Sequence, residues 1–216
     1  MPNRQAGFTL VEIAIVLVII GLLLGGVLKG QELINSAKVK NLAQDFRSTA
    51  TMVYAYQDRF RALPGDDSAV ATHVNGGTAA NPAGPVFGRI DGNWNSTTAT
   101  DESFLFWQHV RLASLAAGVT EIGSPDYIPR NTEGRPIGIT GVPPLTAPAT
   151  PWPGAFYVCS TGLLGRFVRQ LDQTMDDGNS LTGAVRALAD DTASQADASN
   201  VQPQNDGDRY TVCMAF

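Results

Sequence analysis

One long apolar segment near the N-terminus constrains this chain of 216 residues more than any other feature. Residues 8–28 contain no Lys or Arg. At about 1.5 Å per residue, a helix of this length spans about 30 Å, the hydrocarbon thickness of a bilayer. An ordinary secretory signal has a shorter apolar core and then a small-residue cleavage site. Here the run continues into Lys29-Gly30-Gln31-Glu32 without such a site, which predicts a membrane-spanning helix.

Glu12 is the one acidic residue inside this segment. An unpaired carboxylate at the centre of a bilayer costs about 2.5–3.5 kcal/mol on insertion scales, and less near the interface. The Glu12 side chain either reaches the lipid headgroups or acquires a positively charged partner later. We favour the second interpretation, in which the partner is an amine close to the start of a neighbouring helix.

The orientation of the segment is indicated by two conflicting signals. Arg4 alone precedes it, whereas Lys29, Lys38, Lys40 and Arg47 follow it. A count of basic residues therefore places the rest of the chain in the cytoplasm. The cysteines favour the opposite orientation, and we let them decide.

Cys159 and Cys213 are the only cysteines, and no C-x-x-C pattern exists, which argues against a zinc ribbon or a redox motif. Each lies in an alternating apolar stretch, FYVCS or YTVCMAF, typical of a strand. They are either two free buried thiols or a disulfide between neighbouring strands. We predict the disulfide, which requires an oxidising compartment.

The N-terminal residues Gly7-Phe8-Thr9-Leu10-Val11-Glu12, followed by an uninterrupted apolar run, resemble the type III signal of type IV pilins and type II secretion pseudopilins. The resemblance covers residues 1–30. It implies that a prepilin peptidase cleaves between Gly7 and Phe8 on the cytoplasmic face, and that Phe8 is then N-methylated. It also implies that Glu12 pairs with the Phe8 amine of an adjacent subunit during assembly.

The same resemblance implies a single-pass protein of the bacterial inner membrane with a periplasmic head, which is later incorporated into a pilus or pseudopilus. The implied partners are membrane lipid, an inner-membrane assembly platform and other pilins or pseudopilins. The choice between minor pilin and pseudopilin stays open. The alternative is a binding module that is anchored in the membrane, never polymerises, and uses its loops at 75–98 and 119–153.

Beyond the membrane segment, apolar residues recur at spacings of three or four, and no proline occurs between Phe8 and Leu63, so a single helix is predicted over residues 8–62. The predicted fold class is α+β: a long N-terminal α-helix, membrane anchor plus amphipathic stem, packed on a small antiparallel β-sheet head with long loops. The predicted divisions are a leader (1–7), a transmembrane half (8–28), a stem (29–63) and a head (64–216).

Within the head, the sequence predicts helices and strands separated by polar loops. Caps, turn residues and apolar periodicity mark helices at 66–73, 102–117 and 164–175, and strands at 155–160, 182–188 and 209–215. Residues 75–98, 119–153 and 189–208 are predicted loops, and residues 176–179 a turn.

The chemistry of the head indicates no enzyme. Residues 64–216 hold 8 Arg and 16 acidic residues, a balance that repels phosphate and disfavours nucleic acid as a partner. No nucleophile elbow, P-loop, dinucleotide fingerprint or H-E-x-x-H motif occurs. His73 and His109 are isolated, and His109 is interpreted as structural or surface-exposed. We expect no catalytic residue and no cofactor.

One stretch offers a calcium alternative. Asp91, Asn93, Asn95 and Glu102 have the spacing of positions 1, 3, 5 and 12 of an EF-hand loop. Position 6 is Ser96 instead of glycine and position 9 is Ala99, and no helix pattern leads into the loop. We therefore prefer a solvated loop and expect no metal.

Overall fold

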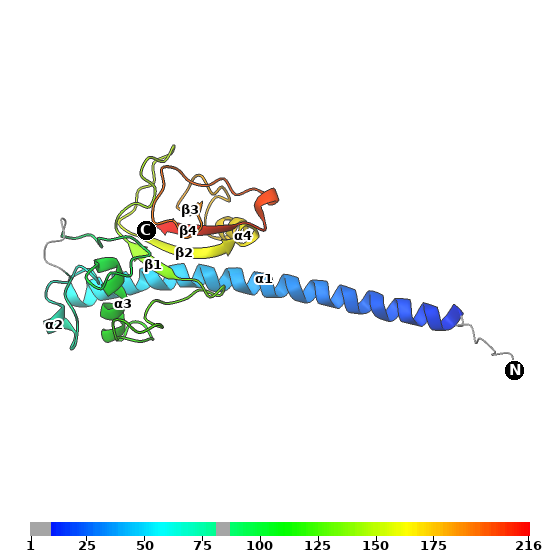
Figure 1. Ribbon diagram of the computed structural model, residues 1–216, viewed down its shortest axis with the longest axis horizontal. Helices are drawn as coiled ribbons and strands as arrows, with labels where there is room; N and C mark the ends of the chain where they lie inside the picture. Colours follow the sequence, from blue (N-terminus) through cyan, green and yellow to red (C-terminus); the bar gives the residue numbers. More distant parts are fainter. Residues whose placement is uncertain (1–9, 81–86) are drawn as a thin grey trace. The chain divides into compact units, whose positions relative to one another are not determined.

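The computed structural model describes residues 10–80 and 87–216, and the predicted cleavage-site residues Gly7 and Phe8 lie outside these ranges. The chain forms two compact units, residues 1–38 and 39–216. Helix α1 (Leu10–Phe60) contributes to both (Figure 1). The helix predicted over residues 8–62 is thus confirmed over residues 10–60.

The end of α1 differs slightly from the prediction. The sequence places the stop at Pro64, but the helix ends at Phe60. Arg61 adopts a positive φ of 55° while its N–H still donates to the Gln57 carbonyl at 2.9 Å. A left-handed residue just after the last turn is a common helix terminator.

In the second unit, one face of α1 forms part of the main core. Val39, Leu42, Phe46 and Val53 are each at most 2% exposed and belong to the largest cluster of buried side chains. That cluster also takes in apolar residues of the sheet and of the two longer head helices. The apolar stripe predicted from the spacing of residues 39–53 is therefore the face that packs.

A four-stranded antiparallel sheet forms the centre of this unit, as predicted for an α+β head. Its strands are β1 (Ile137–Thr140), β2 (Tyr157–Leu164), β3 (Val185–Ala189) and β4 (Arg209–Ala215), in the order β1-β2-β4-β3. The last strand of the chain thus lies between β2 and β3. The three predicted strands are present: β4 has the predicted ends, whereas the ends of β2 and β3 are shifted.

Strand β1 contradicts the prediction that residues 119–153 form only a loop. It is four residues long and pairs with β2, opposing Ile137 to Ser160 and Thr140 to Tyr157. Gly138 allows the backbone to approach closely, because a Cβ there would lie 1.8 Å from the Trp94 carbonyl oxygen. Tertiary pairing, rather than a local pattern, makes this segment a strand.

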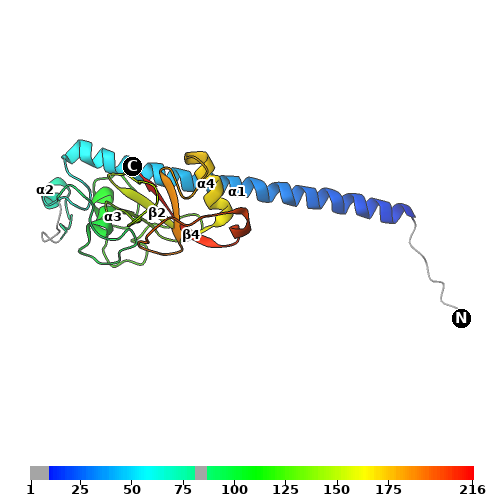
Figure 2. The ribbon, with the colours of Figure 1, turned by 90° about the horizontal axis from the view of Figure 1, so that it is seen from above.

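The head helices are α2 (Val70–His73), α3 (Glu102–Leu112) and α4 (Gly165–Met175), together with the short 3₁₀ helix η1 (Pro203–Asn205). Helices α3 and α4 lie at opposite ends of the sheet in both ribbon views (Figure 1, Figure 2). Helix α3 stops five residues before the predicted end at 117, because Ser114 takes a positive φ of 61°. The N-cap residue of α3, Asp101, makes no capping hydrogen bond with its side chain; its carboxylate accepts the Ser96 hydroxyl proton at 2.6 Å.

The predicted disulfide is confirmed. Cys159 of β2 and Cys213 of β4 are register partners, bonded with a Cα–Cα distance of 4.1 Å, and both side chains are 0% exposed. They belong to a second core cluster with Trp94, Trp152 and Leu188. Their neighbours along the strands, Val158 and Val212, belong to the main cluster. The bridge therefore lies on the face of the sheet opposite α1.

Candidate functional site

The first half of α1 carries an apolar surface that no described residue of its own unit covers. Every residue from 10 to 29 is exposed, including Leu10 at 86% and Leu22 at 72%. Among the described residues, α1 is the one helix long and apolar enough to cross a membrane by length and composition, with a window of mean hydropathy 2.8. A monomeric soluble protein rarely exposes an apolar surface of this size.

Glu12 lies in the first described turn of this helix, between apolar neighbours. A carboxylate near the start of a helix is favoured by the partial positive charge of the helix N-terminus. The predicted cleavage site between Gly7 and Phe8, and the Phe8 amine, lie just before this turn and outside the described residues. The role of Glu12 in assembly therefore stays a prediction.

The glycines of this segment leave bare backbone on the helix surface. A Cβ added at Gly21, Gly25, Gly26 or Gly30 would meet no atom within 4 Å. Gly21 and Gly25 are four residues apart, as are Gly26 and Gly30, the small-xxx-small spacing that lets two helices approach closely in a membrane. The segment thus offers apolar side chains beside places for close helix contact.

The calcium candidate at 91–102 is held together by hydrogen bonds within the protein. The Asp91 N–H donates to a Glu102 carboxylate oxygen at 2.7 Å, and Arg89 donates to the Asp91 carboxylate at 2.6 Å. The Asn95 amide instead donates to the Asp191 carbonyl at 3.4 Å. The structure therefore brings Asp91 and Glu102 together, whereas the Asn95 side chain contacts another loop.

Glu102 is 6% exposed, and its burial raises its pKa to about 7. The nearby negative charges of Asp66 and Asp91 raise this pKa further, while the Asp91 N–H opposes the shift. Asn93 uses its backbone carbonyl to accept the Ser103 hydroxyl proton at 2.8 Å. The expectation of a solvated loop without metal, with calcium as the alternative, therefore stays a prediction.

His109 is a structural residue, as the sequence suggested. It is 0% exposed, and its Nδ1 accepts the Gly65 N–H at 2.9 Å. That bond leaves the proton on Nε2, which donates to the Thr78 carbonyl at 2.8 Å. Burial lowers the pKa of the His109 imidazole. The neutral ring therefore joins the segment after α1 to the loop that follows α2.

The two long loops predicted as ligand contacts converge on one cavity of about 340 Å³. Trp94 and Asn95 line it from the first loop, and Ile128 and Arg130 from the second. Trp107 of α3 completes an aromatic wall. Aromatic surface with a few polar groups is typical of small-ligand sites.

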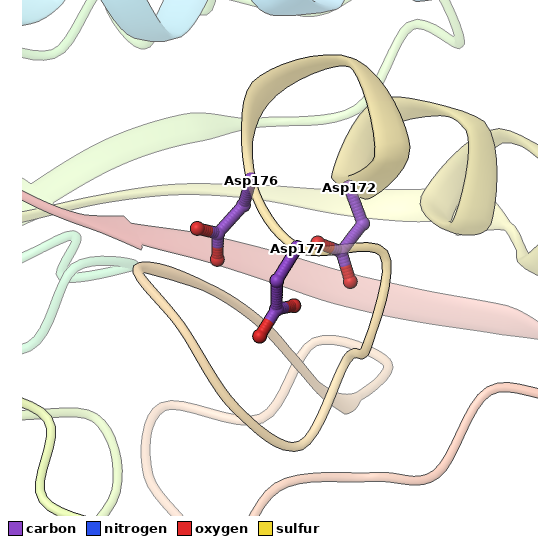
Figure 3. A group of neighbouring side chains, drawn as sticks. All are labelled: Asp172, Asp176 and Asp177. Atoms are coloured by element: carbon purple, nitrogen blue, oxygen red, sulfur yellow. The ribbon is translucent and has the colours of Figure 1, made fainter.

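A group of carboxylates that the sequence did not single out lies at the C-terminal end of α4 (Figure 3). Asp172, Asp176 and Asp177 each place an oxygen within 4.8 Å of the others. Asp172 is 1% exposed, and burial raises its pKa to about 7, with further contributions from the charges of Asp177 and Asp176. The sequence signal was the spacing D-x-x-x-D-D, of which only the Asp176-Asp177 pair had been interpreted, as part of a turn.

Comparison with known proteins places the N-terminal segment in context. Residues 2–28 match the model of the prokaryotic N-terminal methylation motif. No curated protein and no solved structure matches the chain. The matched range includes residues 10–28, nearly all of the exposed apolar half of α1. Residues 2–28 therefore carry the N-terminal motif that marks type IV pilin-like and pseudopilin-like prepilins.

Proposed function

We propose that this chain is a minor pilin or pseudopilin, a structural subunit that polymerises through α1 into a type IV pilus or a type II secretion pseudopilus. The observation that carries the proposal is the methylation motif at 2–28, which includes the exposed apolar start of α1. Pilin-like proteins are normally non-enzymatic structural proteins. Their general partners are prepilin peptidase and other pilins.

In this proposal, prepilin peptidase cleaves between Gly7 and Phe8 and the new amine of Phe8 is methylated. An α-amine has a pKa near 8, so it is mostly positively charged at neutral pH. Methylation leaves that amine able to hold a proton. The Phe8 amine of one subunit then pairs with Glu12 of the next, which offsets the cost of a carboxylate in lipid.

The exposed apolar surface has a role both in the subunit held in the inner membrane and in the subunit assembled in the filament. Before assembly, it contacts the hydrocarbon of the inner membrane. In the filament, the same surface packs against the helices of other subunits. Lipid tails are as apolar as leucine side chains, so close packing and polar pairs must drive this exchange. Gly21, Gly25, Gly26 and Gly30 provide the close approach, and Glu12 provides the polar pair.

We propose further that the head is periplasmic. The Cys159–Cys213 disulfide supports this orientation, because disulfides persist in the periplasm and are rare in the cytosol. In this orientation the subunit is a single-pass protein of the inner membrane until the assembly platform extracts it.

The mass of the membrane form tests the proposal. The full chain is expressed with an active prepilin peptidase and, as the control, with an inactive one. With the active enzyme we expect a chain that begins at a methylated Phe8 and that cross-links to other pilins in sheared filaments. An intact Met1 in both strains would contradict the proposal.

The second candidate function is a membrane-anchored binding module that does not polymerise. The cavity formed by the loops at 87–98 and 119–153 favours it. This candidate predicts an unprocessed N-terminus and loss of ligand binding when Trp107 is replaced by Ala. The two functions are therefore separated by the same mass measurement.

A further inference from the structure

Two of the carboxylates at the end of α4 accept hydrogen bonds that stabilise the turn after this helix. Asp176 accepts the Val185 N–H at 2.9 Å. Asp177 accepts the Asn179 N–H at 2.9 Å and the Thr182 hydroxyl proton at 2.6 Å. These bonds order the segment between α4 and β3, but they leave one oxygen of the group unexplained.

That oxygen is Oδ2 of Asp172. The residue is 1% exposed, and Oδ2 is buried without a hydrogen-bond partner, whereas Oδ1 accepts the Gly178 N–H at 3.1 Å. Leaving a buried acceptor unsatisfied is costly, and more so for a charged group. The side chain also lies beside two further carboxylates, Asp176 and Asp177. A positive charge at this point would both interact with the unpaired oxygen and reduce the repulsion among the three carboxylates.

Among the ion pairs of the described residues, none joins a basic side chain to these three carboxylates. The charge of Arg186 interacts at longer range with Asp197, Asp176 and Asp177. Its N–H groups, however, donate to the backbone carbonyls of Gly183 at 3.1 Å, Thr150 at 2.9 Å and Pro151 at 2.8 Å. Arg186 is therefore already committed to the loop that precedes β2 and to the turn before β3.

We propose that Asp172, Asp176 and Asp177 bind a calcium ion. The donors are all carboxylate oxygens, which hard divalent cations prefer. Ca²⁺ accepts irregular arrangements at about 2.3–2.6 Å from each oxygen, so it spans oxygens as much as about 4.8 Å apart. Mg²⁺ needs near-octahedral geometry at about 2.0–2.1 Å, which restricts opposite oxygens to about 4.2 Å.

The backbone at Gly183 leaves space for the Asp176 carboxylate beside the other two. A Cβ at Gly183 would lie 1.9 Å from Oδ2 of Asp176, and Gly183 has a positive φ of 69°. Glycine suits this position because it has no Cβ to collide with Asp176 and because it readily adopts a positive φ. Only three protein ligands and an exposed Asp177 indicate moderate affinity, with a Kd of about 10⁻⁴–10⁻³ M, the range of extracellular calcium modules.

The test uses the full chain in detergent micelles, stripped with EDTA. At 10 mM Ca²⁺ we expect the melting temperature of the head to rise by about 3–10 °C, with a smaller rise in 10 mM Mg²⁺. Isothermal titration should give one Ca²⁺ per chain. Absence of a rise in the wild type, or an equal rise with Mg²⁺, would overturn the proposal.

Two variants and a control make the result specific. In Asp177→Asn, the amide oxygen still accepts from Asn179, but the ligand charge is lost, so the calcium response should disappear. Asp172→Asn keeps the acceptor for Gly178 and removes the buried charge, so it should melt at or above the wild type in EDTA and ignore Ca²⁺. The exposed Asp126→Asn, away from the group, should respond as the wild type does. If Asp172→Asn does not fold, Asp177→Asn decides alone, and a full response there would reject the site.

Discussion

Removing the bridge between β2 and β4 should destabilise the head without affecting the membrane half of α1. Cys159 and Cys213 are separated by 54 residues, and a cross-link that closes such a loop restricts the unfolded chain. The chain-entropy relation gives about 4 kcal/mol for a loop of this length, in a measured range of about 0–5 kcal/mol. The strand that is tied, β4, is the one that both β2 and β3 pair with.

The expected change in melting temperature follows from the size of the head. For domains of about 150–250 residues, 1 kcal/mol shifts the melting temperature by about 2–4 °C. The double variant Cys159→Ala with Cys213→Ala should therefore melt about 8–16 °C below the oxidised wild type. Circular dichroism of the full chain in micelles measures this, and limited proteolysis should reveal new cleavage in the polar loop at 190–208.

The single variants provide the matched control. Cys159→Ala and Cys213→Ala each abolish the cross-link as fully as the double variant does. If the cross-link is the cause, all three proteins should melt within a few degrees of one another. A stepwise loss from single to double variant would show that the side chains act through packing. A drop of less than about 2 °C in all three would refute the loop-closure reasoning.

Three further predictions concern the N-terminus and a buried histidine. Glu12→Ala should insert into the membrane at least as well as the wild type, because an apolar residue is favoured in lipid, but sheared filaments or cross-linked oligomers should be reduced at least tenfold; normal assembly would exclude the proposed pair. Gly7→Val should block cleavage and leave a chain seven residues heavier by mass spectrometry, and a mature-length product would contradict a cut before Phe8. The His109 ring should stay neutral with its proton on Nε2 at pH 6.5, as read from nitrogen shifts by NMR, because burial lowers its pKa in the folded state; its contribution to stability should therefore be lost as the pH falls below about 6.5 toward the folded-state pKa, and a charged ring at pH 6.5 would disprove this.

Much of the fold follows from local patterns in the sequence. The long proline-free run with apolar residues three or four apart predicts α1, because that spacing places them on one helix face. Alternation around Cys159 and Cys213 predicts β2 and β4, and a lone cysteine pair in two strands predicts their bridge. The methylation motif is also local, since a peptidase reads it as a linear segment.

Elements that depend on distant partners could not be predicted in this way. Strand β1 has only four residues and contains Gly138, so its pattern is too short to identify, and its extended form comes from pairing with β2. The ends of α1 and α3 depend on Arg61 and Ser114, two ordinary residues held at positive φ. Nothing in their local sequence marks them as terminators.

The candidate sites also differ in whether the local sequence or the tertiary structure reveals them. The proposed processing and assembly residues, Gly7, Phe8 and Glu12, can be named from the sequence, because the motif that suggests them is one short continuous segment. The acidity of Asp172, Asp176 and Asp177 is equally visible there, and a turn is a sufficient explanation for two of them. Only the tertiary structure buries Asp172 and leaves its Oδ2 without a donor, because this depends on how α4 packs against the sheet.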